Sequence, residues 1–369
     1  MSSRVVLVVV LVLAAVALGL LFWVQCRPGT TISGPRTTVG GAWYEIGFTQ
    51  PRYPDRPEYH RGGLDERLVA LIDQTRRTLD VAIYDFDLSN VATAMARAKA
   101  RGVTVRMVTD TDTVEAKNNA PVQQALAAVR EAGIPIVDDQ RGAIMHHKFV
   151  VSDGEVVLTG SWNFTDGDTY RLNNNAVRFT SRELAANFSA EFEKMFAQHA
   201  FGPTKPKGVP HPLVQIGDAR VETHFGSEED PSVRLIQLIK GARRRIDFLA
   251  FSFTHEGIGE AVMERGGAGV AVRGVFETTG SETRFSEFGK LKERGFEVYQ
   301  DGNPYVMHHK VFVIDERVTV FGSFNFSANA AESNDENMVV VDDPRFARTF
   351  LEEVERIVTQ AKNPVRGSR

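Results

Sequence analysis

Residues 145–153 read Met-His-His-Lys-Phe-Val-Val-Ser-Asp and are followed, at 160–163, by Gly-Ser-Trp-Asn. The chain repeats this arrangement at 307–315, which read Met-His-His-Lys-Val-Phe-Val-Ile-Asp, with Gly-Ser-Phe-Asn at 322–325. Both copies follow the pattern His-x-Lys, four residues, Asp, six residues, Gly-Ser-x-Asn. Because chance does not produce two copies with identical internal spacing, the sequence predicts a chemically defined site that is built twice.

The sequence around the two copies is also duplicated, which predicts two related halves. In each half an apolar pattern at helical spacing precedes a buried strand, a small-residue helix, a second strand and a third helix. Gly102 in the first half corresponds to Gly269 in the second, and Gly133 corresponds to Gly295. Strands that alternate with helices are typical of layered α/β folds. We therefore expect two α/β sandwich repeats related by a pseudo-twofold axis.

The 369 residues are enough for about two domains, and their composition is that of a globular protein with a core. The net charge of −4 gives no overall cationic field of the kind that nucleic-acid binders carry. The single cysteine, Cys26, excludes an internal disulfide framework and a cysteine-based zinc cluster. The predicted boundaries are 5–24 for a transmembrane anchor, 25–43 for a linker, 44–201 for the first repeat, 202–217 for a second linker, 218–361 for the second repeat and 362–369 for a tail.

The repeated motif predicts a polar cluster on one face of a strand. An apolar run follows each His-x-Lys, and period-2 geometry then places His146 and Lys148 on one face and His147 on the other. The motif ends in a hairpin turn, after which Ser161 and Asn163 again share a face. The corresponding residues of the second copy are His308 and Lys310 opposite His309, and Ser323 with Asn325.

If the two halves meet face to face, two imidazoles and two ammonium groups converge. Two cations with amide and hydroxyl donors suit an anionic oxygen cluster, above all a phosphodiester. One imidazole would attack phosphorus and the other would protonate the leaving alkoxide. Zinc binding by the paired histidines is disfavoured because an adjacent lysine repels a cation. We therefore expect neither a metal nor a cofactor.

Both copies match the HKD signature, so the chain resembles the phospholipase D superfamily from about residue 44 to residue 361. The resemblance implies a metal-independent phosphodiesterase that acts through a covalent phosphohistidine, with both motifs forming one site within a monomer. It also implies that one motif histidine is the nucleophile and the other the general acid. The residues expected to bind the phosphate are Lys148, Lys310, Asn163, Asn325, Ser161 and Ser323, while Asp153 and Asp315 support the site, the hairpin turn alone being enough to explain Asp153.

One difference between the halves assigns the histidine roles. Glu336 and Asn174 stand equally far after the histidines of their own halves. A neighbouring carboxylate favours an imidazolium, whereas a neutral amide does not. If each lies behind the histidine of its own half, His308 rests protonated as the general acid and His146 rests neutral as the nucleophile. This order agrees with the one that the resemblance implies.

Residues 5–24 form an unbroken apolar run. At about 1.5 Å per residue, a helix of this length spans a hydrocarbon core of about 30 Å. No cleavage site of the A-x-A type follows, which favours an uncleaved signal anchor over a cleaved signal peptide. The short N-terminal tail favours a single-pass bacterial protein with an extracytoplasmic catalytic part, although Arg4, Arg27 and Arg36 fix the orientation poorly.

Three substrate classes fit the resemblance. The first is a phospholipid of a membrane surface, which a phospholipase D would hydrolyse at the head-group ester to phosphatidate. The second is a nucleic acid, which a nuclease would cleave. The third is the lipid substrate of a phosphatidyltransferase such as a cardiolipin synthase. The apolar run favours lipid, and the overall acidity mildly opposes a long nucleic-acid groove. The resemblance implies that a typical cardiolipin synthase is a longer chain with two membrane segments, which counts against the third class. The sequence therefore favours a phospholipase D-type phosphoric diester hydrolase.

Overall fold

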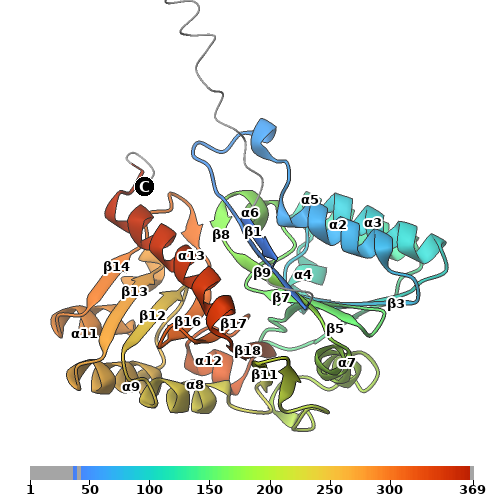
Figure 1. Cartoon of the computed structure of the whole chain (residues 1–369). Coiled ribbons are helices and arrows are strands. Elements are labelled where there is room, and N and C mark those ends of the chain that lie inside the picture. The colour runs from blue at the N-terminus through green and yellow to red at the C-terminus, as the bar shows by residue number, and fades with distance from the viewer. Residues whose placement is uncertain (1–35, 40–42, 366–369) are drawn as a thin grey trace, which may run out of the picture. The chain divides into compact units, whose positions relative to one another are not determined.

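The chain forms two equivalent sheets, which Figure 1 shows, and the two copies of the motif lead into equivalent strands of them. The structure is a computed structural model that describes residues 36–39 and 43–365. Within these residues each half forms an eight-stranded sheet, ordered β1-β2-β9-β7-β6-β3-β4-β5 in the first half and β10-β11-β18-β17-β16-β12-β13-β14 in the second. The predicted duplicated α/β fold is therefore confirmed.

The first half contains sixteen described elements and is followed by one short helix. They are β1 (Arg36–Val39), β2 (Tyr44–Phe48), η1 (Pro57–Tyr59), α2 (Leu64–Gln74), β3 (Thr78–Ile83), α3 (Ser89–Ala100), β4 (Thr104–Thr109), α4 (Thr111–Glu115), α5 (Ala120–Glu131), β5 (Ile136–Asp138), β6 (Lys148–Ser152), β7 (Val156–Gly160), α6 (Asp166–Tyr170), β8 (Leu172–Asn173), β9 (Asn175–Thr180), α7 (Arg182–Phe196) and then η2 (Gly202–Thr204).

The second half repeats this order. Its elements are β10 (Val214–Ile216), β11 (Ala219–Gly226), α8 (Pro231–Lys240), β12 (Arg245–Ala250), α9 (Glu256–Gly267), β13 (Ala271–Phe276), α10 (Thr278–Ser281), α11 (Glu287–Glu293), β14 (Glu297–Gln300), β15 (Val306–Met307), β16 (Lys310–Ile314), β17 (Val318–Gly322), α12 (Ala328–Glu332), β18 (Glu336–Asp342) and α13 (Pro344–Lys362).

The sheet register places both lysines of the motif at the same edge of their sheets. Strand β6 runs antiparallel to β3, and Lys148 pairs with Ile83 at the carboxyl end of β3. In the second half Lys310 pairs with Ala250 at the carboxyl end of β12. Each of these strands is parallel to its other neighbour, β4 or β13. Ligands of such sheets bind beyond the carboxyl ends of the parallel strands, which is where the motifs begin.

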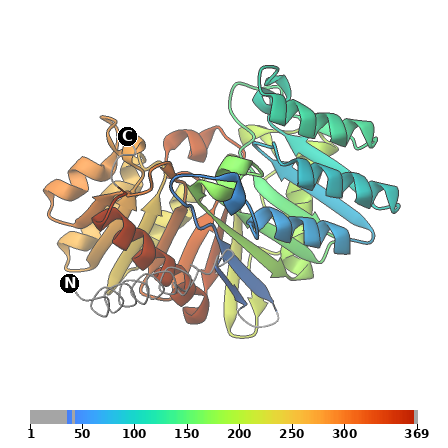
Figure 2. The ribbon, with the colours of Figure 1, turned by 90° about the horizontal axis from the view of Figure 1, so that it is seen from above.

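Each sheet is covered by helices on its outer face. Helices α2, α3 and α5 pack on the first sheet, as Figure 2 shows, and α8, α9 and α11 pack on the second. Their apolar stripes and the outward side chains of the strands form a separate core in each half. Helices α3, α5, α9 and α11 also come after parallel strands, so the loops at the carboxyl ends of those strands lie at the edge that carries the motifs.

A third core joins the halves. It is built from the inward faces of both sheets together with α7 and α13, the last helix of each half. Phe188 on α7 packs edge-on against Phe225 of the second sheet, at 5.2 Å between ring centroids. Phe346 on α13 stacks on Phe179 of the first sheet at 6.3 Å. Because each half supplies rings to the core of the other, the halves are fixed face to face.

Segments outside the repeats need separate comment. Strand β1 pairs with β2 although it falls in the predicted linker 25–43, and β10 pairs with β11 although it begins in the predicted linker 202–217. The repeat boundaries themselves stay predictions. The anchor predicted at 5–24 lies outside the described residues. Among the helices that the structure does describe, none combines the length and apolar character needed to cross a membrane.

Phe350 tests how much the shared core contributes to stability. It is 0% exposed and lies against Phe48, Phe321 and Phe346, at 5.3, 5.4 and 5.3 Å between ring centroids. Phe350→Ala is expected to lower the free energy of unfolding by about 3–5 kcal/mol, because it leaves a cavity between the halves. Urea unfolding followed by circular dichroism measures the change. The control Phe285→Ala, at a side chain that is 61% exposed, should change it by only about 0.5 kcal/mol.

Candidate active site

The histidine of each motif is anchored by the opposite half of the chain. The backbone N–H of His146 donates to the carbonyl oxygen of Asp335 at 2.9 Å, and that of His308 donates to the carbonyl oxygen of Asn173 at 2.9 Å. Short parallel pairings surround both bonds, between β15 and β8 on one side and between Met145 and Asp335 on the other. The two motifs are therefore brought together across the pseudo-twofold axis, as expected.

The residues that contact Nδ1 of each histidine also come from the opposite half of the chain. Both carboxylate oxygens of Glu336 lie 2.8 Å from Nδ1 of His146, whereas Oδ1 of Asn174 lies 2.9 Å from Nδ1 of His308. The predicted pairing within each half is therefore wrong. The cause is the hydrogen bond between the halves described above. Because Asp335 is bonded to His146, the next residue, Glu336, lies at the first motif. Burial raises the pKa of Glu336 to about 7, against the pull of the neighbouring lysine charges.

A second carboxylate, which the sequence analysis missed, stands near His308. Oδ1 of Asp168 lies 3.3 Å from Nδ1 of His308, and it also accepts a hydrogen bond from Nδ2 of Asn174 at 3.0 Å. Asp168 belongs to the short helix α6, and the corresponding residue of the second half is Ala330. Each half thus contributes one carboxylate from a different position. The signal available in the sequence was that the first half has the carboxylate of Asp168 where the second half has Ala330.

The serines of the motif hold the residues behind the histidines. Oγ of Ser161 donates to Oδ1 of Asn174 at 2.8 Å, and Oγ of Ser323 donates to Oε2 of Glu336 at 2.6 Å. Each hydroxyl oxygen also accepts a backbone N–H bond from the first residues of β9 or β18. Since both hydroxyl hydrogens are already used, we assign these serines to orienting Asn174 and Glu336 in place of the predicted contact with phosphate.

Both lysines are buried at the centre of the site. Nζ of Lys148 donates to the carbonyl oxygen of His146 at 2.9 Å, and Nζ of Lys310 makes the same bond to His308. Across the described chain, no carboxylate lies within ion-pair distance of either ammonium group. Burial lowers the pKa of Lys148 to about 8 and, together with the charge of Lys148, lowers that of Lys310 well below its ordinary value. The two ammonium groups of the ligand-free site therefore have no anion in direct contact within the described residues.

The same electrostatics act on the histidines. Burial lowers the pKa of His146 well below its ordinary value, and the charges of Lys148 and Lys310 lower it further. Burial and Lys310 lower the pKa of His308 to about 3, although Asp168 opposes this shift. Both imidazoles are thus neutral in the ligand-free site. The prediction that His308 rests protonated is wrong there, because the sequence could not show how deeply both lysines are buried beside it.

The asparagines of the Gly-Ser-x-Asn segments have unused hydrogen-bonding capacity. Asn163 is buried and Asn325 is half-buried. In the described structure, Oδ1 of neither side chain has a hydrogen-bond partner. Nδ2 of Asn163 makes one long bond, 3.4 Å, to Asp168. Both side-chain amides are therefore available to a ligand, as the sequence analysis expected.

The second histidine of each motif points away from the site, as predicted. Nε2 of His147 lies 3.3 Å from Oε1 of Glu191 on α7, and Nε2 of His309 lies 3.1 Å from Oε1 of Glu353 on α13. All four side chains are fully buried between the halves. These pairs fix the last helix of each repeat against the strand that carries the motif.

Asp153 and Asp315, predicted as supporting residues, lie at the far end of β6 and β16 from the histidines. Both adopt left-handed backbone conformations, with φ of 55° and 54°, in the hairpin turn. Their carboxylates accept backbone N–H bonds, including one of 2.6 Å from Arg77 and one of 2.7 Å from Arg244. Partial burial acts to raise their pKa values, but these donors hold both below the ordinary value. Their support is therefore structural.

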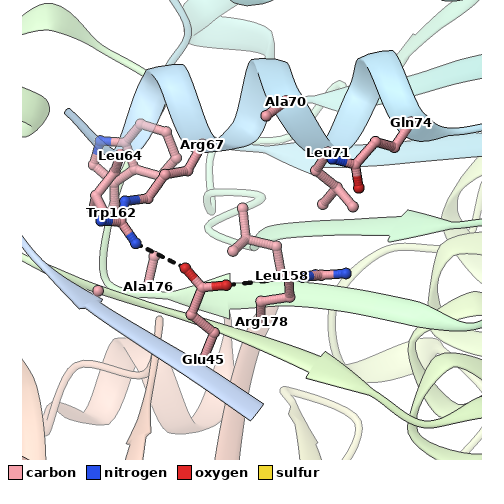
Figure 3. Close-up of a pocket in the computed structure, with 11 residues that line it drawn as sticks. Glu45, Leu64, Arg67, Ala70, Leu71, Gln74, Leu158, Trp162, Ala176 and Arg178 are labelled. Carbon is pink, nitrogen blue, oxygen red and sulfur yellow. Dashed lines mark hydrogen bonds and ion pairs between the residues drawn. The ribbon is translucent and has the colours of Figure 1, made fainter. Parts of the chain in front are cut away.

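A groove on the outer face of the first sheet is separate from this site (Figure 3). It lies beneath α2, has a volume of about 190 Å³, and carries Glu45 between Arg67 and Arg178 at 2.8 and 3.8 Å. Trp162 of the first motif lines it, but the motif histidines and lysines do not. The phenylalanines beside the motifs do not form a pocket either: Phe164, Phe324 and Phe326 are all packed in the outer cores.

Comparison with known proteins places this geometry among related chains. The sequence matches the family described as "Cardiolipin synthase, PLD-like domain" over residues 68–196 and 235–358. It is 36% identical over 127 residues to the mitochondrial cardiolipin hydrolase of Homo sapiens, and 28% identical over 156 residues to a phospholipase D of Rickettsia bellii. These alignments cover 34% and 42% of this chain.

The chain spans about half the length of the human relative, 50%, and 78% of the rickettsial one. Among solved structures, phosphatidylserine synthase of Haemophilus influenzae Rd KW20 superimposes with a TM-score of 0.60 at 14% identity. That likeness covers 81% of this chain and 84% of the other, and it shows a shared fold.

Two buried ammonium groups without a contacting anion in the described structure predict that the site binds inorganic phosphate. At about 100 times its dissociation constant, phosphate should stabilise the folded protein by about 2.7 kcal/mol, seen as a higher Tm. Lys148→Met and Lys310→Met are each expected to abolish this increase, whereas Lys362→Met, at an exposed ion pair with Glu297, should retain it. An equal increase in all four proteins would contradict phosphate binding at the site.

Proposed function

This chain belongs to the family described as "Cardiolipin synthase, PLD-like domain", and we propose that it is a phospholipase D-type phosphodiesterase. In this proposal it hydrolyses the head-group ester of a phospholipid through a covalent phosphohistidine. The observation that carries the proposal is the crossing of the two halves, which gives His146 a carboxylate partner and His308 an amide partner at 2.8 and 2.9 Å. Two buried lysines complete the same site.

The bound phosphodiester brings negative charge to these two buried lysines. Its two non-bridging oxygens would accept hydrogen bonds from Lys148, Lys310 and the side-chain amides of Asn163 and Asn325. Because these donors are held by packing before the substrate arrives, little reorganisation is needed when charge develops on the oxygens. The phosphate charge also raises the pKa values of the lysines and of His308, so that His308 can hold the proton that it lacks in the free site.

The first chemical step forms a bond between Nε2 of His146 and phosphorus and breaks the bond from phosphorus to the head-group oxygen. Nδ1–H of His146 donates to Glu336, which leaves the lone pair of Nε2 free for the attack. His308 gives its Nε2 proton to the departing oxygen, so the head group leaves as an alcohol. In the second step His308 takes a proton from water, whose oxygen attacks phosphorus and breaks the bond to His146. The products are the free enzyme and phosphatidate.

The unequal partners of the two histidines support this division of roles. Phosphorylated His146 carries a positive imidazolium charge, which the carboxylate of Glu336 directly stabilises. His308 must instead give up a proton. The nearest partner of its Nδ1 is the amide oxygen of Asn174 at 2.9 Å, and the carboxylate of Asp168 lies farther away at 3.3 Å. Its cation is therefore stabilised less than that of His146, which makes His308 the stronger acid. The assignment of the sequence analysis is kept, but its physical reason is reversed. The carboxylate lies behind the nucleophile.

Two observations favour a lipid substrate. The human and rickettsial relatives are named as a cardiolipin hydrolase and a phospholipase D. Residues 5–24 also have the length and apolar character of a membrane anchor, which would hold the site beside a bilayer. We propose on this basis a single-pass bacterial membrane protein with its catalytic part outside the cytoplasm. Its partner would be the phospholipid surface itself.

The substrate class is tested with the full chain in detergent micelles, with EDTA present. Vesicles of phosphatidylcholine, phosphatidylglycerol and cardiolipin, and single- and double-stranded DNA, are offered in parallel. We expect equal amounts of phosphatidate and free head group, and no product from His146→Ala. DNA cleavage without lipid hydrolysis would instead identify a nuclease. Lipid products formed only with an added alcohol would identify a phosphatidyltransferase.

The histidine roles are tested by trapping the covalent intermediate. A labelled p-nitrophenyl phosphodiester needs no acid to release its leaving group, so His308→Asn should still form the adduct and then accumulate it at His146. His146→Asn should form none. Mass spectrometry of tryptic fragments, kept at alkaline pH because phosphohistidine is acid-labile, locates the label. A label on His308, or an adduct in the His146 variant, would reverse the assignment.

Glu336 predicts a pH dependence. Because burial raises its pKa to about 7, the carboxylate that His146 needs forms as the pH rises through this value. We expect kcat/KM, which reports on the free enzyme, to rise with an apparent pKa near 7. Glu336→Gln should lose this dependence and about 100-fold or more in kcat. The matched control is Glu353→Gln, a buried carboxylate beside His309, which should leave the pH profile unchanged.

A further inference from the structure

A buried cluster of charges occupies the segment between the two halves. Lys205 follows η2 within the predicted linker 202–217, yet its side chain is 0% exposed. A buried ammonium group is strongly destabilising unless it is paired, so its partners identify what the segment does. The motif chemistry described above does not use this lysine.

The ammonium group of Lys205 joins three buried carboxylates. It contacts Oε1 of Glu191, lies 3.1 Å from Oε2 of Glu228, and lies 2.6 Å from Oδ1 of Asp335. Lys194 contacts Glu191 and Glu228 at 3.1 and 3.0 Å. In the described structure only Lys205 of these two lysines reaches Asp335. The cluster therefore contains two cations that share Glu191 and Glu228. Lys205 alone also contacts Asp335 and makes a long bond, 3.5 Å, to the carbonyl oxygen of Gly226.

Asp335 connects this cluster to the nucleophile. Its carbonyl oxygen accepts the backbone N–H of His146, and its own N–H donates to the carbonyl oxygen of Ile144 at 2.9 Å. Its carboxylate, 0% exposed, also accepts from Arg141 at 2.7 Å and from the backbone N–H of Gly202 at 2.8 Å. The next residue along the chain is the carboxylate partner of His146. The side chain of Asp335 thus fixes the backbone that sets both bonds of that imidazole.

The other crossing in the molecule is built without charge. The corresponding residue of the first half is Asn173, whose carbonyl oxygen accepts the backbone N–H of His308. Its Oδ1 accepts a hydrogen bond from Nδ2 of Asn303 at 2.7 Å. An amide pair is therefore sufficient to hold a crossing strand. Of the two crossings, the one held by charged side chains is at His146, the histidine that we assign as the nucleophile.

We propose that Lys205 is a positioning residue for the reaction and acts through Asp335 to hold His146 and Glu336 in line for attack on phosphorus. This role rests on the proposed function, because it presumes that His146 is the nucleophile. Lys205 does not touch the substrate. Its contact with Glu191, the partner of His147, also ties the first motif strand to the same point.

The test compares Lys205→Met with Lys194→Met in the full chain. Both variants remove a buried cation from Glu191 and Glu228, but only the first removes the contact with Asp335. We expect Lys205→Met to lower kcat by about 10- to 100-fold with KM changed by less than about twofold, since partners of a reacting group typically have effects of this size. Lys194→Met should change kcat by less than about threefold. Circular dichroism at the assay temperature selects conditions in which both are folded.

A second variant covers the case in which Lys205→Met does not fold. Asp335→Asn keeps Lys205 and introduces the residue type that the first half carries at its own crossing, so it should fold. It is expected to lower kcat in the same range. Lys205→Arg, which keeps the charge, should recover part of the activity of Lys205→Met.

Nitrogen-15 NMR of histidine-labelled protein gives a readout that does not depend on activity. In the wild type the His146 signals, assigned by their loss in His146→Gln, should show one tautomer with the proton on Nδ1. Lys205→Met and Asp335→Asn should show a mixture of tautomers, and Lys194→Met should not. Equal kcat in the two lysine variants with unchanged His146 signals would overturn the proposal. If the wild type cleaves no phosphodiester, the proposed function fails, and the His146 signals still decide the role of Lys205.

Discussion

The hydrogen bonds from the backbone N–H groups of His146 and His308 to the opposite half are the constraint on which the site depends. Each motif strand begins beside the carboxyl ends of the parallel strands of its own sheet, and without the crossing the histidine just before it would have no partner at Nδ1. The crossing supplies that partner and sets the distance between the halves. It also explains why α7, α13 and the inward-facing rings form one shared core, since the halves must be held face to face for both bonds to form.

The charges of the site follow from this arrangement. Burying two lysines beside two histidines is costly unless an anion joins them. Glu336 and Asp168 act on both lysines, and Asp85 and Asp110 act on Lys148, but none forms an ion pair with either ammonium group in the described structure. Glu336 and Asp168 both act on the Nδ1 side of the imidazoles, which leaves the Nε2 side for the phosphate. Burial of these charges therefore destabilises the ligand-free site, but it also holds the groups in place for the substrate. The serines and the buried Lys205 cluster keep that arrangement rigid.

Much of the fold could be predicted because the duplication supplied two independent readings of the same pattern. The strand that carries His146 and Lys148, the opposite direction of His147, and the pairing of the two halves all follow from period-2 geometry and repetition. The identity of the Nδ1 partners could not be predicted, because spacing along the chain does not show whether a strand crosses to the other half. The loss of charge on His308 was missed for a related reason, since the depth of burial depends on both halves at once. Lys205 was read as part of a linker because its glycine- and proline-rich surroundings hide a residue whose three partners come from distant segments.

The crossing also has a consequence for the order in which the protein is made. Domains fold from the N-terminus while synthesis continues, so the first repeat can complete its sheet long before the ribosome reaches β18. At that stage His146 has neither the carbonyl of Asp335 nor the carboxylate of Glu336, and Lys205 has lost one of its counter-charges. A nascent chain that has not yet reached β18 therefore lacks these partners of His146. The site is therefore completed only when the last repeat docks.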